Sequence, residues 1–386
     1  MAEVFFAVCP RGIEEVLARE LEALGGAGVK ASAGGVQFGG TLATAYAANL
    51  HSRVASRILW LVASGGYRDE ADLYRLAHDI PWEREFAVDQ RLRVDVTAIR
   101  SPLQSLQFAT LKIKDAIVDR ARERTGERPT VDRAQPDVQV LAHLDERNAR
   151  LYIDLSGESL FKRGWRADKG EAPIKENLAA ALLLLSGWTP DRPLLDPFCG
   201  SGTIVIEAAC MATGRAPGLN RRFGFEKLQG FDRAAWAELQ KQARAAVDDA
   251  APFQLVGRDI STGVIAIAQS NAVRAGLGAV LDSGKLILEA GDARAAAPPA
   301  ESGVIVTNPP YGEQSNPRSA SVADMMGDVA TQLKRQYAGW QAWLLSSDRN
   351  LPRQMRLREA RKTVIFNGAL ECRFFRFDMV AGSNRK

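Results

Sequence analysis

Hydrophobic and polar positions follow different patterns in the first and second parts of the chain. Residues 91–99 alternate, with Leu92, Val94 and Val96 on one face and charged or hydroxyl side chains on the other. A period of two is typical of strands with one buried face. Further along the chain, apolar runs end in acidic or amide residues and helical patterns follow, an order typical of parallel sheets with crossover helices. The two patterns predict an α+β module followed by an α/β domain.

The beginning of the chain alternates between strand and helix patterns. Residues 4–8 and 36–38 predict strands, and residues 13–24 place apolar side chains at helical spacing before a glycine pair. Residues 43–61 predict a second helical stretch. The order strand, helix, strand, helix favours a ferredoxin-like fold.

A long charged helix is predicted over residues 105–124. Basic side chains, among them Lys112 and Lys114, are interleaved with acidic ones along it. This pattern suits either a solvated face with internal ion pairs or a surface that contacts RNA, and the sequence leaves both open. Residues 138–143 and 151–155 then predict an antiparallel pair of strands.

The segment from Leu194 to Ala208 gives the strongest local signal. An apolar run ends at Asp196, a turn with Gly200 and Gly202 follows, and a helix begins near Gly202. Backbone N–H groups at a helix N-terminus can hold a polar ligand, and glycines let that ligand approach the backbone. The turn has neither the lysine of a P-loop nor the third glycine of a dinucleotide site. An acidic strand end favours a cationic or zwitterionic ligand; a tight turn without a ligand is the alternative.

The sequence of this turn resembles motif I of the class I S-adenosylmethionine-dependent methyltransferases that act on nucleic acid. The resemblance implies that the turn binds S-adenosylmethionine and that the loop before the preceding helix closes over its methionine end. The matching turn residues are Asp196, Pro197, Phe198, Cys199, Gly200, Ser201, Gly202 and Thr203, and the matching loop residues are Lys175, Glu176 and Asn177.

Two acidic residues compete for the end of the second strand. Asp232 has nearly the usual spacing from a nucleotide-binding turn, but a charged, alanine-rich helix pattern follows it. Asp259 ends a clear apolar run and is followed by Ser261, a helix-capping residue. We therefore expect Asp259 to hold the cofactor ribose, with Ile260 against the adenine. Residues 214–250 then form an insertion in the first crossover.

The next two strand ends carry further polar groups. Residues 285–289 predict a strand that leads to Asp292 and Ala293, where a carboxylate can accept a hydrogen bond from an adenine amino group. Residues 303–307 predict the following strand, which ends in the tetrad Asn308, Pro309, Pro310 and Tyr311.

The tetrad suits methyl transfer to an exocyclic amine. This reaction needs no nucleophilic side chain, but the amine lone pair must be aimed at the methyl group. Asn308 can accept an amine proton, Pro309 can offer a backbone carbonyl, and Tyr311 can stack on a flipped base. A double proline that only ends a strand is the alternative.

The end of the chain completes a seven-stranded sheet with a C-terminal antiparallel hairpin. Residues 324–337 predict a helix and residues 340–346 a strand, and two further strands pair through Asn367-Gly368. Basic residues gather just before the hairpin, Arg356 among them. Phosphate contact and a solvated face suit this basic cluster equally.

Composition excludes several classes of protein. The chain has 386 residues, 46% of them hydrophobic and 25% charged, with a net charge of +4 that permits nucleic-acid binding without requiring it. Its four cysteines form no C-x-x-C pair, which argues against a metal site or a disulfide framework and for a reducing cytoplasm. We find no signal-peptide pattern and no membrane-length apolar stretch, so a soluble cytoplasmic protein is expected.

The first half resembles the THUMP domain with its N-terminal ferredoxin-like partner, through Pro10–Glu14, Leu111–Asp119 and Asp154–Gly157. In that family the module binds structured RNA. The resemblance implies three domains, a ferredoxin-like part (1–60), a THUMP domain (61–160) and a Rossmann-like class I methyltransferase domain (161–386). The basic segment from Leu160 to Arg166 joins the halves. The RNA-binding candidates are Lys112, Lys114, Arg163, Arg166 and Arg356.

The whole chain resembles the bacterial guanine-N2 methyltransferases of 23S ribosomal RNA. In some bacteria these enzymes are the front half of a longer fused protein; since this chain ends after its hairpin, no second methyltransferase half is expected. The resemblance implies a monomer that modifies 23S rRNA or a precursor large subunit, without a metal or membrane. N2-guanine or N6-adenine methylation of tRNA or another RNA, glutamine methylation and a ribosome-assembly factor are the alternatives.

Overall fold

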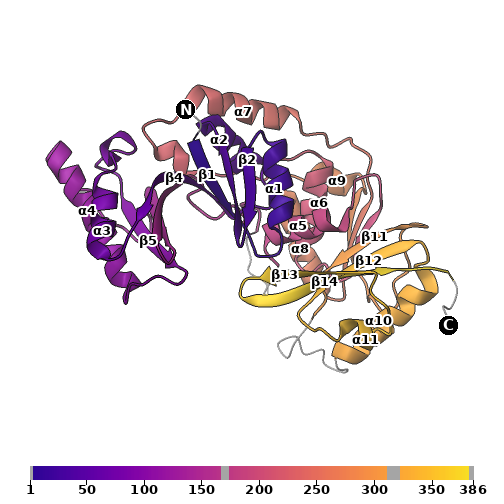
Figure 1. The fold of residues 1–386 in the computed structure, drawn as a ribbon. Coiled ribbons are helices and arrows are strands. Elements are labelled where there is room, and N and C mark those ends of the chain that lie inside the picture. The colour runs from indigo at the N-terminus through magenta and orange to yellow at the C-terminus, as the bar shows by residue number, and fades with distance from the viewer. Residues whose placement is uncertain (1–2, 167–173, 311–321, 382–386) are drawn as a thin grey trace. The chain divides into compact units, whose positions relative to one another are not determined.

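The computed structural model describes residues 3–166, 174–310 and 322–381 (Figure 1). The chain divides into two compact units that do not follow the sequence linearly. Unit 1 consists of Met1–Cys9, Ala18–Leu160 and Arg221–Lys241, and unit 2 of Pro10–Leu17, Phe161–Asn220 and Gln242–Lys386. Each unit contains one seven-stranded sheet.

The sheet of unit 1 joins the ferredoxin-like strands to the strands that follow them. Its order is β2-β3-β1-β4-β7-β6-β5, and β4 pairs antiparallel with both β1 and β7. Strands β6 and β7 form the expected antiparallel pair, whereas β5 runs parallel to β6. The strands are β1 (Glu3–Val8), β2 (Ala27–Ser32), β3 (Gly35–Gly40), β4 (Arg57–Gly66), β5 (Leu92–Ala98), β6 (Val138–Leu144) and β7 (Asn148–Asp154).

The predicted helical stretch over residues 43–61 is wrong in its second part. Helix α2 ends at His51, and β4 begins at Arg57. The carboxylate of Glu20 accepts hydrogen bonds from Ser52 Oγ (2.5 Å) and Arg53 N (2.7 Å), which draws the chain out of the helix. The apolar residues that follow then pair with β1, an interaction that no local pattern contains.

The helices and short 3₁₀ segments of this part of the chain include some that the sequence did not predict, α3 among them. Helix α4 begins after the capping side chain of Ser105 and ends before the left-handed Gly126, close to the predicted range of residues 105–124. The elements are α1 (Glu14–Ala23), α2 (Leu42–His51), α3 (Glu70–His78), η1 (Trp82–Arg84), α4 (Leu106–Thr125), η2 (Gly224–Lys227) and α7 (Arg233–Ala245).

The insertion between α6 and β9 contributes an aromatic cluster to unit 1. Tyr46 of α2 lies 4.4 Å from Phe225 between ring centroids, and Trp236 of α7 lies edge-on to Phe225 at 5.0 Å. Phe223 stacks on Phe225 at 5.2 Å. Aromatic rings of this size bury a large apolar area, so residues 221–241 are part of the core of unit 1.

Unit 2 has the predicted seven-stranded sheet with a C-terminal antiparallel hairpin. Its order is β10-β9-β8-β11-β12-β14-β13; the first five are parallel, and β14 is antiparallel to both β12 and β13. The strands are β8 (Leu194–Asp196), β9 (Leu255–Asp259), β10 (Leu286–Ala290), β11 (Gly303–Thr307), β12 (Trp340–Ser346), β13 (Arg361–Asn367) and β14 (Leu370–Asp378).

Helices cover both faces of this sheet. Helices α10 and α11 lie on one side and α5 and α6 on the other (Figure 1). Met326 of α10 packs in one buried cluster with Ile305, Trp340 and Phe375 of the sheet. The helices are α5 (Glu176–Ser186), α6 (Thr203–Ala212), α8 (Thr262–Arg274), α9 (Gly278–Asp282), α10 (Val322–Gln336) and α11 (Leu351–Gln354).

The edge strand β13 is covered by residues from the start of the chain. Phe366 N donates a hydrogen bond to Arg11 O at 2.9 Å, and the Arg11 guanidinium lies 4.7 Å above the Phe366 ring. Gly12 has φ +92°, and a Cβ there would lie 2.2 Å from Val364 O. Exposed strand edges invite pairing with other chains, and this segment blocks part of one.

Candidate active site

The four polar strand ends meet at one edge of the sheet in unit 2. Strands β10, β9, β8 and β11 are adjacent and parallel, so their carboxyl ends lie together. Asp259 ends β9, Asp196 ends β8, and Asp292 and Asn308 follow β10 and β11. Ligands of open α/β sheets bind at such carboxyl ends. Asp232, the rejected candidate, instead caps the backbone N–H groups of Ala234 and Ala235 in unit 1.

Asp196 is a buried carboxyl group at the centre of this edge. It is 1% exposed and accepts hydrogen bonds from Thr307 Oγ1 (2.6 Å) and Phe198 N (3.1 Å). Burial raises its pKa to about 7, because the charged form loses solvation that these two donors only partly replace. The group is thus poised to ionise when a cation approaches.

The turn after β8 is held to the end of β9. Gly200 N donates to Asp259 Oδ2 at 3.2 Å, and Ser261 N donates to Asp259 Oδ1 at 2.9 Å. Gly200 has φ +54°, and a Cβ built there meets nothing within 4 Å. The space in front of this turn is therefore open, as binding of a ligand against the backbone requires. Helix α6 begins at Thr203, after Gly202 at φ +86°.

The remaining residues of the turn pack beneath it. Pro197 and Cys199 are buried, and Phe198 packs against the core of unit 2. Cys199 N donates to Arg258 O at 2.8 Å. Burial raises the pKa of the Cys199 thiol well above its ordinary value, which makes it a poor nucleophile.

The adenine-side candidates lie on neighbouring strand ends. The Ile260 side chain directly follows β9 and is 70% exposed, so an adenine ring could pack against it. The carboxylate of Asp292 is paired with Arg294, whose Nη2 lies 2.6 Å from Oδ2 and whose guanidinium lowers the pKa of Asp292. Ala293 packs against the core.

Arg166, expected at an RNA surface, instead binds side chains of the turn after β8. Its guanidinium is paired with Glu176 at the start of α5 (Nε to Oε1, 2.8 Å). It also donates to Ser201 Oγ (3.1 Å) and to Thr203 Oγ1 (2.8 Å). One side chain thus joins the turn to the first residue of α5.

Arg163 lies in the interior of unit 2. Its side chain is 3% exposed and is paired with Glu207 of α6, Nε to Oε1, at 3.3 Å. A guanidinium buried in this way does not reach an RNA phosphate, so the structure removes it from the expected RNA surface. The buried position also explains why α6 carries a charged residue on an apolar face.

The loop before α5 is only partly within the described residues. Lys175 is the N-cap of α5, and its ammonium lies 4.7 Å above the Phe161 ring. Glu176 is 4% exposed, and burial raises its pKa against the opposing effect of Arg166. Asn177 is fully buried within α5. These three predicted residues therefore lie at the helix start, beside the Arg166 contacts.

Asn308 carries a buried polar atom at the strand ends. Among the described residues, its Oδ1 is buried and makes no hydrogen bond. A buried acceptor without a donor costs free energy of about 1–3 kcal/mol, which a bound N–H group would recover. Pro309 is buried and Pro310 half-buried, whereas Tyr311 lies outside the described residues.

The other RNA candidates lie on surfaces of their own unit. On α4, the Lys112 ammonium lies 5.4 Å above the Phe108 ring, and Lys114 is paired with Asp115 at 2.6 Å. Arg356 follows α11 in unit 2 with an exposed side chain and φ +49°. Lys112 and Lys114 belong to unit 1, whereas Arg356 and the strand ends described above belong to unit 2.

Sequence reasoning missed Thr307 and the role of Arg166. Thr307 is the one hydroxyl residue of the apolar strand β11, and its position directly before Asn308 was an available signal. The contacts of Arg166 had no signal, because its partners are distant in sequence. Among the described residues no helix has the length and apolarity to cross a membrane, and no cluster of His, Cys, Asp and Glu could hold a metal ion.

The sheet order and the polar strand ends define a class I methyltransferase domain. Three family profiles match the chain, a RlmL ferredoxin-like domain (4–59), a THUMP domain (67–154) and an RMKL-like methyltransferase domain (163–376). The chain belongs to the family of RMKL-like methyltransferase domains, with a ferredoxin-like and THUMP module before it.

Similar proteins agree with this assignment. A relative named ribosomal RNA large subunit methyltransferase K/L from Shewanella baltica (strain OS195) is 40% identical over 99% of the chain. The chain spans 54% of that relative's length. Two solved structures match with a TM-score of 0.88: SMU.472 in complex with SAH (29% identity, 99% of each chain) and a predicted N6-adenine-specific DNA methylase from Listeria monocytogenes (30% identity, 98% of this chain and 97% of that chain).

Proposed function

We propose that the chain transfers a methyl group from S-adenosylmethionine to the exocyclic N2 of a guanosine in 23S ribosomal RNA. The observation that carries the proposal is the buried, unpartnered Oδ1 of Asn308 at the same strand ends as Asp196 and Asp259. An acceptor held there suits an amine that must be oriented rather than activated by a strong base.

The residues at the strand ends fit the cofactor. Asp259 would accept hydrogen bonds from the ribose hydroxyls, and the exposed Ile260 would pack against the adenine. Asp292 would meet the adenine amino group after giving up part of its pairing with Arg294. The open space at Gly200 admits the methionine part against the turn, near the carboxyl group of Asp196. When bound, S-adenosylmethionine supplies an electrophilic methyl group.

Asn308 and its neighbour orient the substrate amine. Asn308 Oδ1 accepts a hydrogen bond from one N–H of the amine, and the carbonyl of Pro309 accepts the other. Both bonds strengthen as the nitrogen becomes positive during attack, so they lower the barrier more than they tighten substrate binding. The product ammonium then loses a proton to solvent, and no thiolate is required, in keeping with the raised pKa of Cys199.

The RNA substrate is inferred from the module that precedes the methyltransferase domain. The ferredoxin-like and THUMP profiles cover residues 4–59 and 67–154. We assign residues 1–60 and 61–160, together with 221–241, to RNA capture and the rest of 161–386 to catalysis. The name of the Shewanella relative points to large-subunit rRNA, and the reaction would take place in the cytoplasm on 23S rRNA or a precursor particle.

Nucleoside mass spectrometry tests the proposal directly. The purified chain, S-adenosylmethionine and 23S rRNA from a strain lacking the enzyme should yield N2-methylguanosine at one position. The matched control is the Asn308→Ala chain, which should modify the RNA at least about a hundredfold more slowly. No methylated nucleoside with the wild-type chain on either naked rRNA or precursor particles would reject the proposed function.

A second candidate is methylation of adenine N6. It is favoured by the name of the Listeria monocytogenes protein, which covers almost the whole chain at 30% identity. The same Asn308 acceptor would serve an adenine amine, so the active-site geometry does not separate the two. The same digest separates them, because N6-methyladenosine and N2-methylguanosine differ in mass and retention.

A further inference from the structure

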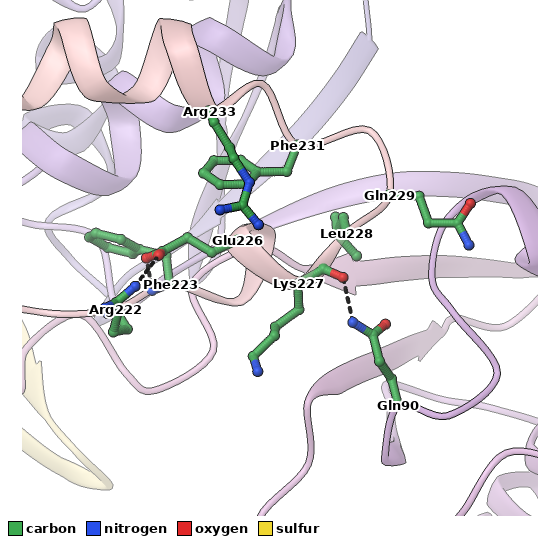
Figure 2. Close-up of a pocket in the computed structure, with 9 residues that line it drawn as sticks. All are labelled: Gln90, Arg222, Phe223, Glu226, Lys227, Leu228, Gln229, Phe231 and Arg233. Atoms are coloured by element: carbon green, nitrogen blue, oxygen red, sulfur yellow. Dashed lines mark hydrogen bonds and ion pairs between the residues drawn. The ribbon is translucent and has the colours of Figure 1, made fainter.

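We propose that a pocket in unit 1, between the insertion and the THUMP region, binds one nucleotide of single-stranded RNA. The pocket has a volume of about 630 Å³, and its lining includes Gln90, Arg222, Lys227, Gln229, Phe231 and Arg233 (Figure 2). The proposal rests on the proposed function in one respect, that the substrate is RNA. It adds a binding site remote in sequence from the strand ends that hold the reaction.

Two hydrogen bonds join the insertion to residues 85–90 beside the pocket. Gln90, just before β5, donates from Nε2 to Lys227 O at 2.6 Å, as the dashed line in Figure 2 shows. Gln229 N donates to Glu85 O at 2.9 Å. The wall behind them is rigid, because Phe223 is stacked on Phe225 and lies edge-on to Trp236 at 5.4 Å. A pocket fixed in this way loses little conformational entropy when a ligand enters.

The charge of the pocket favours an anion. Arg222, Lys227 and Arg233 line it, against the single carboxylate of Glu226. Glu226 is paired with Arg222 at 3.1 Å. Arg233 makes no ion pair within the part of the chain that the structure describes; its guanidinium lies 6.0 Å from the Phe231 ring.

Lys227 is only partly neutralised. Its ammonium lies 3.4 Å from Asp137 Oδ1, and its side chain is 55% exposed. The same Asp137 carboxylate is bound by Arg91 at 2.9 Å, so two cations share it. Arg233 and Lys227 are therefore the cations available to a phosphate.

The combination of groups identifies the ligand class. A phosphate alone would use the cations but neither the aromatic ring nor the amide side chain of Gln229. Phe231 offers a ring for base stacking, and the Gln229 side chain offers hydrogen bonds to a base edge. The Gln90 amide is already bound to Lys227 O and Ala87 N, so it shapes the pocket instead. Small-ligand pockets range over about 300–1,000 Å³, which suits a single nucleotide. A base that is paired in a double helix cannot enter such a pocket, so the bound nucleotide must be unpaired, as in a single strand.

The pocket is lined by segments from two different family matches. Residues 222–233 lie within the stretch matched by the methyltransferase profile, yet they pack in unit 1 beside Gln90 of the THUMP match. The insertion thus gives the RNA-capturing unit a contact that the THUMP strands and helices do not supply themselves.

Fluorescence anisotropy tests the pocket with the full chain. The probe is a fluorescein-labelled single-stranded RNA of about ten nucleotides. The Lys227→Gln/Arg233→Gln chain should bind it at least tenfold more weakly, and the slope of log K against log salt should shrink by about 1.4, since each lost phosphate contact removes about 0.7. The matched control is Lys241→Gln, also on α7 and 80% exposed but outside the pocket, which should bind as the wild type does.

A second variant separates stacking from charge. Phe231→Leu should weaken binding without changing the salt slope, because it removes a ring and no cation. Thermal unfolding of each variant checks that the aromatic cluster is intact. The proposal that the pocket binds a nucleotide would be overturned if the double variant bound the probe with wild-type affinity. It would also be overturned if Lys241→Gln lost as much affinity as the double variant.

Failure of this inference differs from failure of the proposed function. If the wild-type chain methylates rRNA while the double variant keeps its probe affinity and KM, the pocket is wrong and the function stands. If the wild-type chain methylates nothing but the double variant still loses probe affinity, the pocket stands and the function is wrong. If the wild-type chain does not bind the single-stranded probe, the pocket is wrong.

Discussion

Asn308 is the single residue on which the proposed chemistry depends most. Replacing it with alanine removes the acceptor of the amine proton, whose hydrogen bond is strongest while the nitrogen attacks. Asn308→Ala should therefore lower the single-turnover rate by about two to three powers of ten. Affinity for SAH should stay within about twofold, because the acceptor faces the substrate. Rapid-quench methyl transfer and calorimetry measure the two effects; an unchanged rate would refute the assignment.

Asp259 and Asp232 form a matched pair for the cofactor site. Asp259 binds the turn through Gly200 N, whereas Asp232 caps a helix in unit 1. Asp259→Ala should weaken SAH binding by at least about tenfold, since it removes both the ribose acceptor and the support of the turn. Asp232→Ala should leave SAH binding unchanged. Calorimetric titration of both variants decides, and the reverse result would mean that β9 does not carry the ribose contact.

Asp196 should make the protein less stable as pH rises towards neutrality. Burial raises its pKa from 3.8 to about 7, so the folded state holds the proton more tightly than the unfolded state. Below the unfolded-state pKa both states are protonated, and the full stability is present. As pH rises from about 4 to about 7 the unfolded state releases the proton while the folded state keeps it, so the free energy of unfolding falls. Asp196→Asn removes this loss while keeping an acceptor for Thr307 Oγ1. The difference in Tm between the two chains should therefore grow from pH 4.5 to pH 7; parallel curves would contradict it.

At the scale of secondary structure, the segment around Gly12 covers part of the edge strand β13. A Cβ on Gly12 would lie 2.2 Å from Val364 O, so Gly12→Ala must displace the segment from the strand edge. The matched control is Gly368→Ala in the hairpin turn, where φ is +64° but the space is open. Both changes pay for a left-handed alanine, about 1–2 kcal/mol, and only Gly12→Ala adds the clash. Thermal unfolding should show the larger loss for Gly12→Ala; equal losses would show that the segment moves freely.

Local patterns predicted elements where the local and tertiary preferences agree. Ser105 and Gly126 mark both ends of α4, and the Asn367-Gly368 pair correctly indicated the β13–β14 hairpin, whose two turn residues are Gly368 and Ala369. The prediction for residues 43–61 failed because the apolar run after Arg57 suits a helix or a strand, and only its pairing with β1 and β7 selects the strand.

At the scale of the whole molecule, each unit is built from three separate segments of the chain. Phe223, Phe225 and Trp236 are at most 5% exposed because unit 1 surrounds them. A chain cut to residues 161–386 should therefore expose these rings, bind the dye ANS and unfold at a lower temperature than the full chain. The same fragment with residues 221–241 replaced by a Gly-Ser linker should bind little dye. A fragment as stable and dye-free as the full chain would show that the insertion does not need unit 1.

The sequence by itself determined the chemistry at the strand ends. Asp196, Asp259, Asp292 and Asn308 each follow an apolar run, and in a parallel sheet such positions meet at one edge whatever the packing of the helices. Tertiary structure alone decided which basic residues remain exposed. Arg163 and Arg166 have the same local signature as surface arginines, yet Glu207, Glu176 and the turn hydroxyls bind them inside unit 2. The same holds for the insertion, whose aromatic residues find their partner Tyr46 far away in the sequence. Burial and ion pairing depend on residues distant in the chain, and no local period records them.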